Sequence, residues 1–150
     1  MEASEYPKVY LYRRIVEAKL FIDKNFSEKI DLDNIAEESC FSKFHFIRLF
    51  KKAYGKTPHK YLTDVRIEQA RKLLSENISV SDVCFSVGFD SITSFTGLFK
   101  KVNGISPSSF QKRQEEIQAE IQNAPLKFVP HCFAEAKGWI EKSNFEEVNI

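Results

Sequence analysis

The sequence has little of what disulfide-bonded, metal-binding or disordered proteins need. It contains three cysteines, Cys40, Cys84 and Cys132, and none of them belongs to a C-x-x-C pair. An odd cysteine count without metal-ligand spacing predicts neither a disulfide framework nor a zinc site, and it favours a reducing compartment. Five glycines and five prolines in 150 residues argue against long disordered tracts.

Long apolar runs and catalytic patterns are missing as well. No signal-peptide-like segment opens the sequence, and no run of about 18 uncharged apolar residues occurs in it. These absences predict a soluble, cytoplasmic protein without a membrane partner. No Ser-His-Asp, Cys-His, paired-carboxylate or phosphate-loop pattern occurs, so we expect neither an enzyme nor a cofactor, and we expect no metal.

The charges are distributed unevenly, although the net charge is only +1. Residues 41–72 carry nine basic and two acidic side chains. Residues 1–40 carry six basic and nine acidic side chains, residues 73–113 carry four basic and three acidic ones, and residues 114–150 carry three basic and seven acidic ones. A basic block between acidic ends favours a polyanionic partner, and a lysine-rich helix face in water accounts for it equally well.

One short pattern occurs twice. RLFKKAYGKTP at 48–58 returns forty-nine residues later as GLFKKVNGISP at 97–107. We interpret the shared Leu, Phe, Gly and Pro as architectural, because such residues fill a core and set helix ends. The residue at the head of each copy, Arg48 or Gly97, differs, as expected for a position that faces a partner and not the core.

Apolar periodicity predicts helices in both halves. In the first half, helix 9–22 has Val9, Tyr12, Ile15, Val16, Lys19 and Leu20 at helical spacing. Asp31 is expected to cap a helix with Leu32, Ile35 and Ala36 on one face, and Cys40 to Ser42 to form a turn. The next helix, 43–54, is expected to bury Phe46, Leu49, Phe50 and Ala53 and to end at Gly55.

A long helix is expected to begin at Pro58, with Thr57 as its cap, and to bury Tyr61, Leu62, Val65, Ala70, Leu73 and Leu74. Its 18 residues give a length of about 27 Å. The second half then repeats the first. Ser79 and Asp82 open a helix that buries Val83, Cys84 and Val87. Ser91 caps another that buries Phe95, Leu98, Phe99 and Val102, Gly104 ends it, and Ser106-Pro107 starts a last helix.

Each half therefore has the order of a helix-turn-helix unit, whose second helix can lie in a DNA major groove. We expect an all-α fold with two helix-turn-helix subdomains, 8–57 and 76–122, and a linker helix, 58–75. A C-terminal extension of unknown role, 123–150, follows. A linker of about 27 Å suits two recognition helices on successive grooves, which repeat about every 34 Å.

Two segments resemble the DNA-binding region of the AraC/XylS family of bacterial transcription regulators. They are IAEESCFSKFHFIRLFKKAYGKTPHKYLTDVRIEQARKLL at 35–74 and VCFSVGFDSITSFTGLFKKVNGISPSSFQKR at 83–113. The resemblance implies homeodomain-like three-helix lobes, recognition helices in adjacent major grooves of double-stranded DNA, and an activator that contacts RNA polymerase. Because only about forty residues precede the first motif, we expect a stand-alone member without a sensor domain, which binds DNA as a monomer.

The resemblance also implies which side chains face DNA. The expected base-facing residues are Lys43, Phe44, Ile47, Arg48, Ile92, Thr93, Thr96 and Gly97. The expected phosphate contacts are Ser42, His45, Lys51, Lys52, Ser91, Lys100 and Lys101. Arg48 is the main candidate for base readout, because a guanidinium can bond both O6 and N7 of guanine. Since Gly97 has no side chain to bond a base, we predict that the first lobe supplies most of the direct readout.

Several alternatives stay open on sequence alone. Arg48 can pair with a surface carboxylate, and Phe44 and Ile47 can pack against a neighbouring helix. Gly97 can allow close approach of a backbone or relieve crowding between the lobes. The tail, which contains Phe128, Phe133, Trp139 and Phe145, can fold back on the domain or contact a regulator. The alternative function is a helical protein-interaction module that has lost specific DNA binding.

Overall fold

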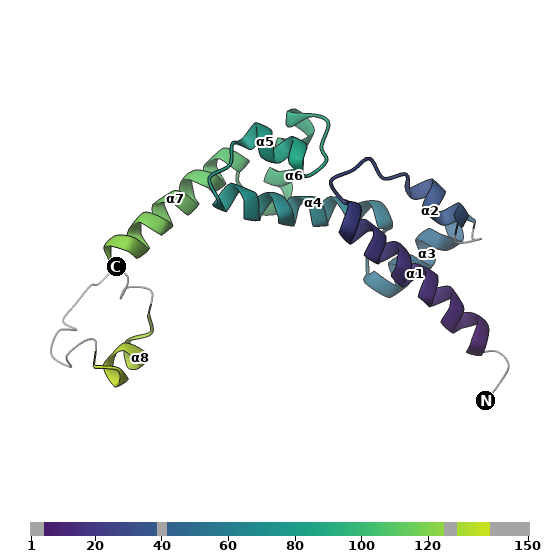
Figure 1. Ribbon diagram of the computed structural model, residues 1–150, viewed down its shortest axis with the longest axis horizontal. Coiled ribbons are helices and arrows are strands. Elements are labelled where there is room, and N and C mark those ends of the chain that lie inside the picture. Colours follow the sequence, from purple (N-terminus) through teal and green to yellow (C-terminus); the bar gives the residue numbers. More distant parts are fainter. Residues whose placement is uncertain (1–4, 39–41, 125–128, 139–150) are drawn as a thin grey trace.

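The computed structural model describes residues 5–38, 42–124 and 129–138, and within these ranges the chain forms α-helices and no strands. The helices are α1 (Glu5–Asn25), α2 (Leu32–Glu38), α3 (Lys43–Tyr54), α4 (Pro58–Ser75), α5 (Val80–Ser86), α6 (Ile92–Asn103), α7 (Pro107–Asn123) and α8 (His131–Ala136). Figure 1 shows α1, α2 and α3 around one end of α4, α5 and α6 beside its other half, and α7 leading away. The predicted all-α fold is confirmed.

The helix ends lie where side-chain chemistry predicts them. Ser42 and Ser91 cap α3 and α6, and each hydroxyl accepts a hydrogen bond from a backbone amide three residues later, at 3.3 and 3.4 Å. Gly55 and Gly104 end the same two helices with φ of 74° and 79°. The predicted turn at Cys40 and Phe41 lies outside the described residues.

The first core is formed by α1, α2, α3 and the start of α4. Its buried members are Ile15, Ala18, Ile22, Ala36, Phe46, Phe50 and Leu62. The predicted burial is wrong at four positions: Val9, Val16 and Leu20 are 68%, 45% and 55% exposed, and Ala53 is exposed. For the three α1 positions the reason is that the helix is apolar on more than one side, whereas the apolar residues it buries are Ile15, Ala18 and Ile22.

The second core lies between α5, α6, α7 and the second half of α4. Its buried members are Ile67, Ala70, Leu74, Val83, Cys84, Val87, Phe95 and Phe99. The inward positions predicted for α5 are confirmed. Val102 was predicted to be buried and is 49% exposed, and Tyr61, Val65 and Leu73 are only half-buried on α4. The periodicity also missed Ile67, which lies fully inside this core.

The tail is described only in part. Phe128, Trp139 and Phe145 lie outside the described residues. Figure 1 shows α8 beyond the C-terminal end of α7 and away from both cores, so the described part of the tail does not fold back on the lobes. None of the described helices is long and apolar enough to cross a membrane.

Candidate DNA-binding surface

The outer face of α3 carries the first set of predicted contact residues. Phe46 and Phe50 point into the core with their rings 5.9 Å apart, and this pair fixes which side of the helix faces outward. Phe44 is 76% exposed, so its predicted outward position is observed. Ile47, in contrast, is half-buried and packs against the first core, which leaves only part of its side chain on the surface.

Arg48 is exposed on the same face. Among the described residues, no carboxylate forms an ion pair with it and no acceptor bonds it, so the surface pairing considered from sequence is not observed there. An exposed guanidinium with no protein partner among these residues is available to a base edge or a phosphate without breaking an internal bond. The structure therefore keeps Arg48 as the strongest contact candidate on α3.

Lys43, at the start of α3, has a protein partner. Its Nζ lies 2.8 Å from Oδ1 of Asp33 on α2, and this hydrogen bond, together with the carboxylate charge, raises the pKa of Lys43. Both side chains are more than half exposed. Exposed ion pairs contribute little to stability, so Lys43 can exchange Asp33 for a DNA phosphate at small cost.

Several cations of the basic block 41–72 have carboxylate partners on α4. Lys56 and Lys60 both bond Asp64 at 2.7 Å, and Arg71 bonds Glu68 at 3.2 Å. Partial burial acts to raise the pKa of Asp64, but the two lysine bonds outweigh it, and the pKa lies below its ordinary value. The exposed cations of this block with no partner among the described residues are Arg48, Lys51, Lys52 and Lys72.

The outer face of α6 offers fewer long polar side chains than the outer face of α3. Ile92 is 42% exposed, Thr93 and Gly97 are exposed, and Thr96 is half-buried. Lys100 and Lys101 in the last turn are exposed, as are Lys51 and Lys52 in the last turn of α3. Both helices thus offer a lysine pair at the same place, whereas only α3 offers an arginine at the centre of its outer face.

Gly97 does not relieve crowding between the lobes. A Cβ built at this position meets no atom within 4 Å among its surroundings, and the glycine lies inside α6. One of the two remaining explanations for Gly97 is close approach of a DNA backbone, and the other is the simple absence of a base contact.

Replacing Gly97 with alanine is therefore expected to raise the free energy of unfolding by about 1 kcal/mol, because alanine restricts the unfolded chain and fits the helix. Urea denaturation followed by circular dichroism measures this gain. DNA affinity measured on the same variant separates the two explanations. A loss of affinity despite the gain in stability indicates close approach of DNA at this position, and unchanged affinity rules it out.

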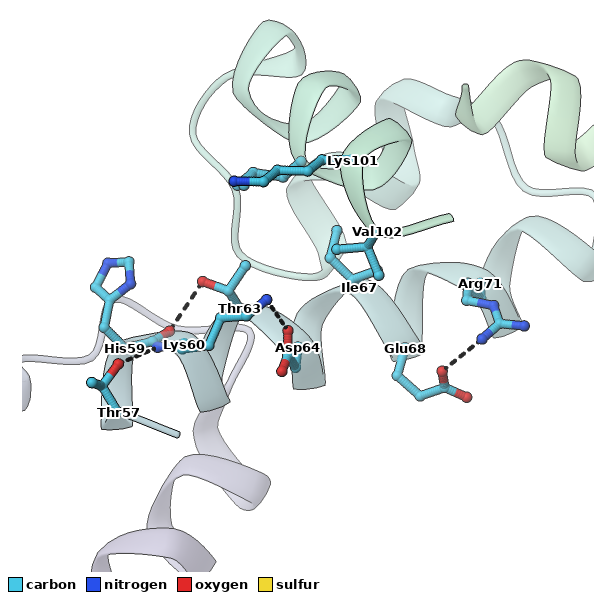
Figure 2. Close-up of a pocket in the computed structure, with 11 residues that line it drawn as sticks. Thr57, His59, Lys60, Thr63, Asp64, Ile67, Glu68, Arg71, Lys101 and Val102 are labelled. Carbon is cyan, nitrogen blue, oxygen red and sulfur yellow. Dashed lines mark hydrogen bonds and ion pairs between the residues drawn. The ribbon is translucent and has the colours of Figure 1, made fainter. Parts of the chain in front are cut away.

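A groove of about 810 Å³ lies between α6 and α4, and its α4 side extends from His59 to Arg71. Figure 2 shows Lys101 and Val102 of α6 on one side and His59, Lys60 and Thr63 of α4 on the other. Val102 lines this groove, which explains why it is not buried. The charges along the groove are mixed, since Asp64 and Glu68 lie among the cations.

The geometry is that of two similar helix-turn-helix units on one connecting helix, and comparison with known proteins agrees with it. A helix-turn-helix domain family of the AraC type matches residues 35–113. The chain belongs to the AraC/XylS family. The match includes α3, α4 and α6 and ends in α7, and it leaves α1 and the tail outside.

Two relatives illustrate how far this AraC/XylS similarity extends. The HTH-type transcriptional activator AarP of Providencia stuartii is 37% identical over 98 residues, which is 65% of this chain and 73% of AarP. The bifunctional transcriptional activator/DNA repair enzyme AdaA of Bacillus subtilis is 38% identical over 93 residues, 61% of this chain and 44% of AdaA. The part of AdaA that matches is the helix-turn-helix region, and the chain spans less than half of that protein.

Solved structures of the AraC/XylS type have the same fold. The DNA-binding domain of AdpA, determined in complex with a target DNA, superposes with a TM-score of 0.63 at 26% identity and covers 74% of this chain and 96% of that domain. The C-terminal domain of the response regulator AraT from Geobacillus stearothermophilus also gives 0.63, at 28% identity, with 67% and 84% covered.

Proposed function

We propose that the protein is a sequence-specific DNA-binding transcriptional regulator that inserts α3 and α6 into adjacent major grooves of one duplex. In this proposal residues 8–57 and 76–122 are the two reading lobes and residues 58–75 hold them apart. The protein binds as a monomer in the cytoplasm, activates transcription through RNA polymerase, and has no enzymatic activity. The names of AarP and AdaA both describe transcriptional activators, and this supports the assignment as a regulator that activates transcription.

One observation carries the proposal: α3 and α6 have the same construction. Each is 12 residues long, begins after a serine cap, ends at a left-handed glycine, and buries two phenylalanines four residues apart. The same outer positions are therefore exposed on both helices, and both last turns carry two lysines. An α4 of about 27 Å plus the width of the lobes suits grooves that repeat about every 34 Å.

The proposed contacts follow from exposure and chemistry. Arg48 reads guanine through its fork of N–H donors, and Phe44 and the exposed part of Ile47 contact thymine methyl groups. Thr93 and Thr96 read weakly beside Ile92 and Gly97. Phosphates are bound by the residues at the helix starts and in the last turns, with Lys43 available to either class: Ser42, His45, Lys51, Lys52, Ser91, Lys100 and Lys101.

Arg48→Ala and Lys51→Ala test the proposal on duplexes selected in vitro for binding. Arg48→Ala is expected to weaken binding to the selected duplex by about 1–3 kcal/mol and to reduce the base preference at one position of the site. Lys51→Ala is expected to weaken binding to all DNA sequences equally and to reduce the slope of log affinity against log salt concentration by about one. Fluorescence anisotropy at several salt concentrations measures both effects.

Lys72→Ala is the matched control, because Lys72 is an exposed cation in the last turn of α4 and is not one of the proposed DNA contacts. It should change affinity and selectivity little. Weak binding with little salt dependence, unaltered by Arg48→Ala, would replace DNA binding with the alternative of a helical protein-interaction module. Equally sharp base preference in both half-sites would remove the proposed asymmetry between the lobes.

A further inference from the structure

We infer that Arg66 is a positioning residue: it fixes the first lobe relative to the second and thereby sets the spacing of the two DNA half-sites. This inference rests on the proposed function. The interlobe junction, as we use the term, consists of the α1–α2 loop at Phe26, Ser27 and Glu28, the α4 residue Arg66, and the α5–α6 turn at Gly88 and Phe89. None of these residues belongs to the proposed DNA contacts.

Arg66 joins α4 to the loop of the first lobe through two hydrogen bonds. Its Nε donates to the carbonyl oxygen of Phe26 at 2.7 Å, and its Nη2 donates to the carbonyl oxygen of Glu28 at 2.9 Å. The planar guanidinium presents these donors in a fixed fork, so the two bonds define an orientation and not only a distance. A lysine at this position would carry its donors on one freely rotating nitrogen, without the fixed planar fork.

The same guanidinium also contacts the second lobe. Its central carbon lies 5.8 Å from the centre of the Phe89 ring, within the range of a cation–π contact. Partial burial lowers the pKa of Arg66, and the nearby charge of Asp90 opposes this effect. One half-buried cation therefore binds the backbone of the first lobe and lies over an aromatic ring of the second.

Gly88 allows the two lobes to approach this closely. A Cβ at this position would lie 2.9 Å from the carbonyl oxygens of Phe26 and Ser27 and 3.0 Å from Nη2 of Arg66. The turn of the second lobe thus packs directly on the loop backbone of the first. Phe26 also packs against both cores, so the junction continues into the interior of each lobe.

A stiff junction has a direct consequence for DNA binding. When one recognition helix is bound, a stiff junction holds the second helix near its own groove and so raises its effective concentration there. This gain occurs only if the spacing of the half-sites matches the spacing that the junction imposes on the two helices. A loose junction lowers this concentration and tolerates other spacings. Arg66 therefore governs the preferred spacing and the gain from the second half-site, whereas Arg48 and the lysines govern contacts within each half-site.

Arg71 supplies the matched control on the same helix. It is also an α4 arginine with an aromatic contact, 5.8 Å from the centre of the Phe110 ring, and it pairs with Glu68. Among the described residues, its partners Phe110 and Glu68 lie on α7 and α4, so Arg71 does not bridge the two lobes. Arg66→Gln and Arg71→Gln remove the same charge. Any difference between the two variants in lobe distance or in half-site spacing is therefore due to the junction and not to the lost charge.

The first experiment needs no DNA. Nitroxide spin labels on Lys24→Cys in α1 and Lys112→Cys in α7, both exposed, report the distance between the lobes by pulsed electron resonance, with Cys40 and Cys132 replaced by serine. We expect a narrow distribution in the parent protein and with Arg71→Gln, loss of that narrow distribution with Arg66→Gln, and partial recovery with Arg66→Lys. An unchanged distribution with Arg66→Gln, in protein that is still helical, overturns the inference.

The second experiment uses the selected duplex and versions with one or two base pairs added or removed between the half-sites. In the parent protein each altered spacing should weaken binding about tenfold or more, and with Arg66→Gln by less than about threefold, while single half-site affinity falls no more than with Arg71→Gln. A parent-like spacing profile with Arg66→Gln overturns the inference. Failure of the parent protein to bind any duplex overturns the proposed function instead, and the distance measurement still tests the junction.

Discussion

Replacing Phe99 with alanine is expected to lower the free energy of unfolding of the second lobe by about 3–5 kcal/mol. Phe99 is fully buried, and its ring centre lies 5.8 Å from that of Phe95 and 5.5 Å from that of Phe110. The truncation removes contacts to α6 and α7 at once and leaves a cavity that helices fixed by their caps cannot close. Since small domains have total stabilities of only about 5–15 kcal/mol, this loss brings the lobe close to unfolding.

Urea denaturation monitored by circular dichroism measures the loss, and Phe50→Ala is its counterpart in the first lobe. Phe50 is also fully buried and lies 4.9 Å from the Tyr54 ring and 5.6 Å from the Tyr61 ring. The two variants should therefore lose similar amounts. A loss below about 1 kcal/mol for either one contradicts the assignment of that ring to the centre of its core.

The local features of this fold could be predicted from the sequence, because each of them depends on residues a few positions apart. A serine followed by a proline or an apolar turn defines a helix start, and a glycine after the last apolar residue defines an end. Phe46 with Phe50, and Phe95 with Phe99, lie one helical turn apart, so their burial follows from spacing alone. The predicted exposure of Phe44 and Arg48 followed from the same spacing and is observed.

The errors occur where a helix has more than one apolar side. On α1, Val16 and Leu20 were as good candidates for burial as Ile15 and Ile22, and only the placement of α3 and α4 distinguishes them. Val102 has the right period for the α6 core, but it faces the groove beside α4. Periodicity describes a single helix, whereas burial depends on the neighbour that packs against it.

Arg66 shows the same limit for polar residues. In the sequence it is one of nine basic residues in a basic block, and its partners are backbone carbonyls 38 and 40 residues away. No spacing rule connects an arginine to carbonyl oxygens in a distant loop, because every residue has such an oxygen. The ion pair between Lys43 and Asp33 was missed because the two residues lie on different helices and meet only through the packing of α2 on α3.

Gly88 and Gly104 allow the interlobe junction to be tested by the addition of a single methyl group. Gly88→Ala and Gly104→Ala both place alanine where the backbone is left-handed, with φ of 92° and 79°. The surroundings differ. At Gly104 a Cβ meets nothing within 4 Å, whereas at Gly88 it meets the carbonyl oxygens of Phe26 and Ser27 at 2.9 Å.

We therefore expect Gly104→Ala to cost about 1–2 kcal/mol of backbone strain, and Gly88→Ala to cost about 2–5 kcal/mol because the clash with the first lobe adds to the strain. Parallel urea denaturation of the two variants measures the difference. The spin-label distance should lengthen with Gly88→Ala only, since backbone carbonyls cannot turn aside as a flexible side chain can. Equal losses of stability with an unchanged distance would mean that the lobes do not meet at Gly88, and α4 alone would then have to hold the two recognition helices in register.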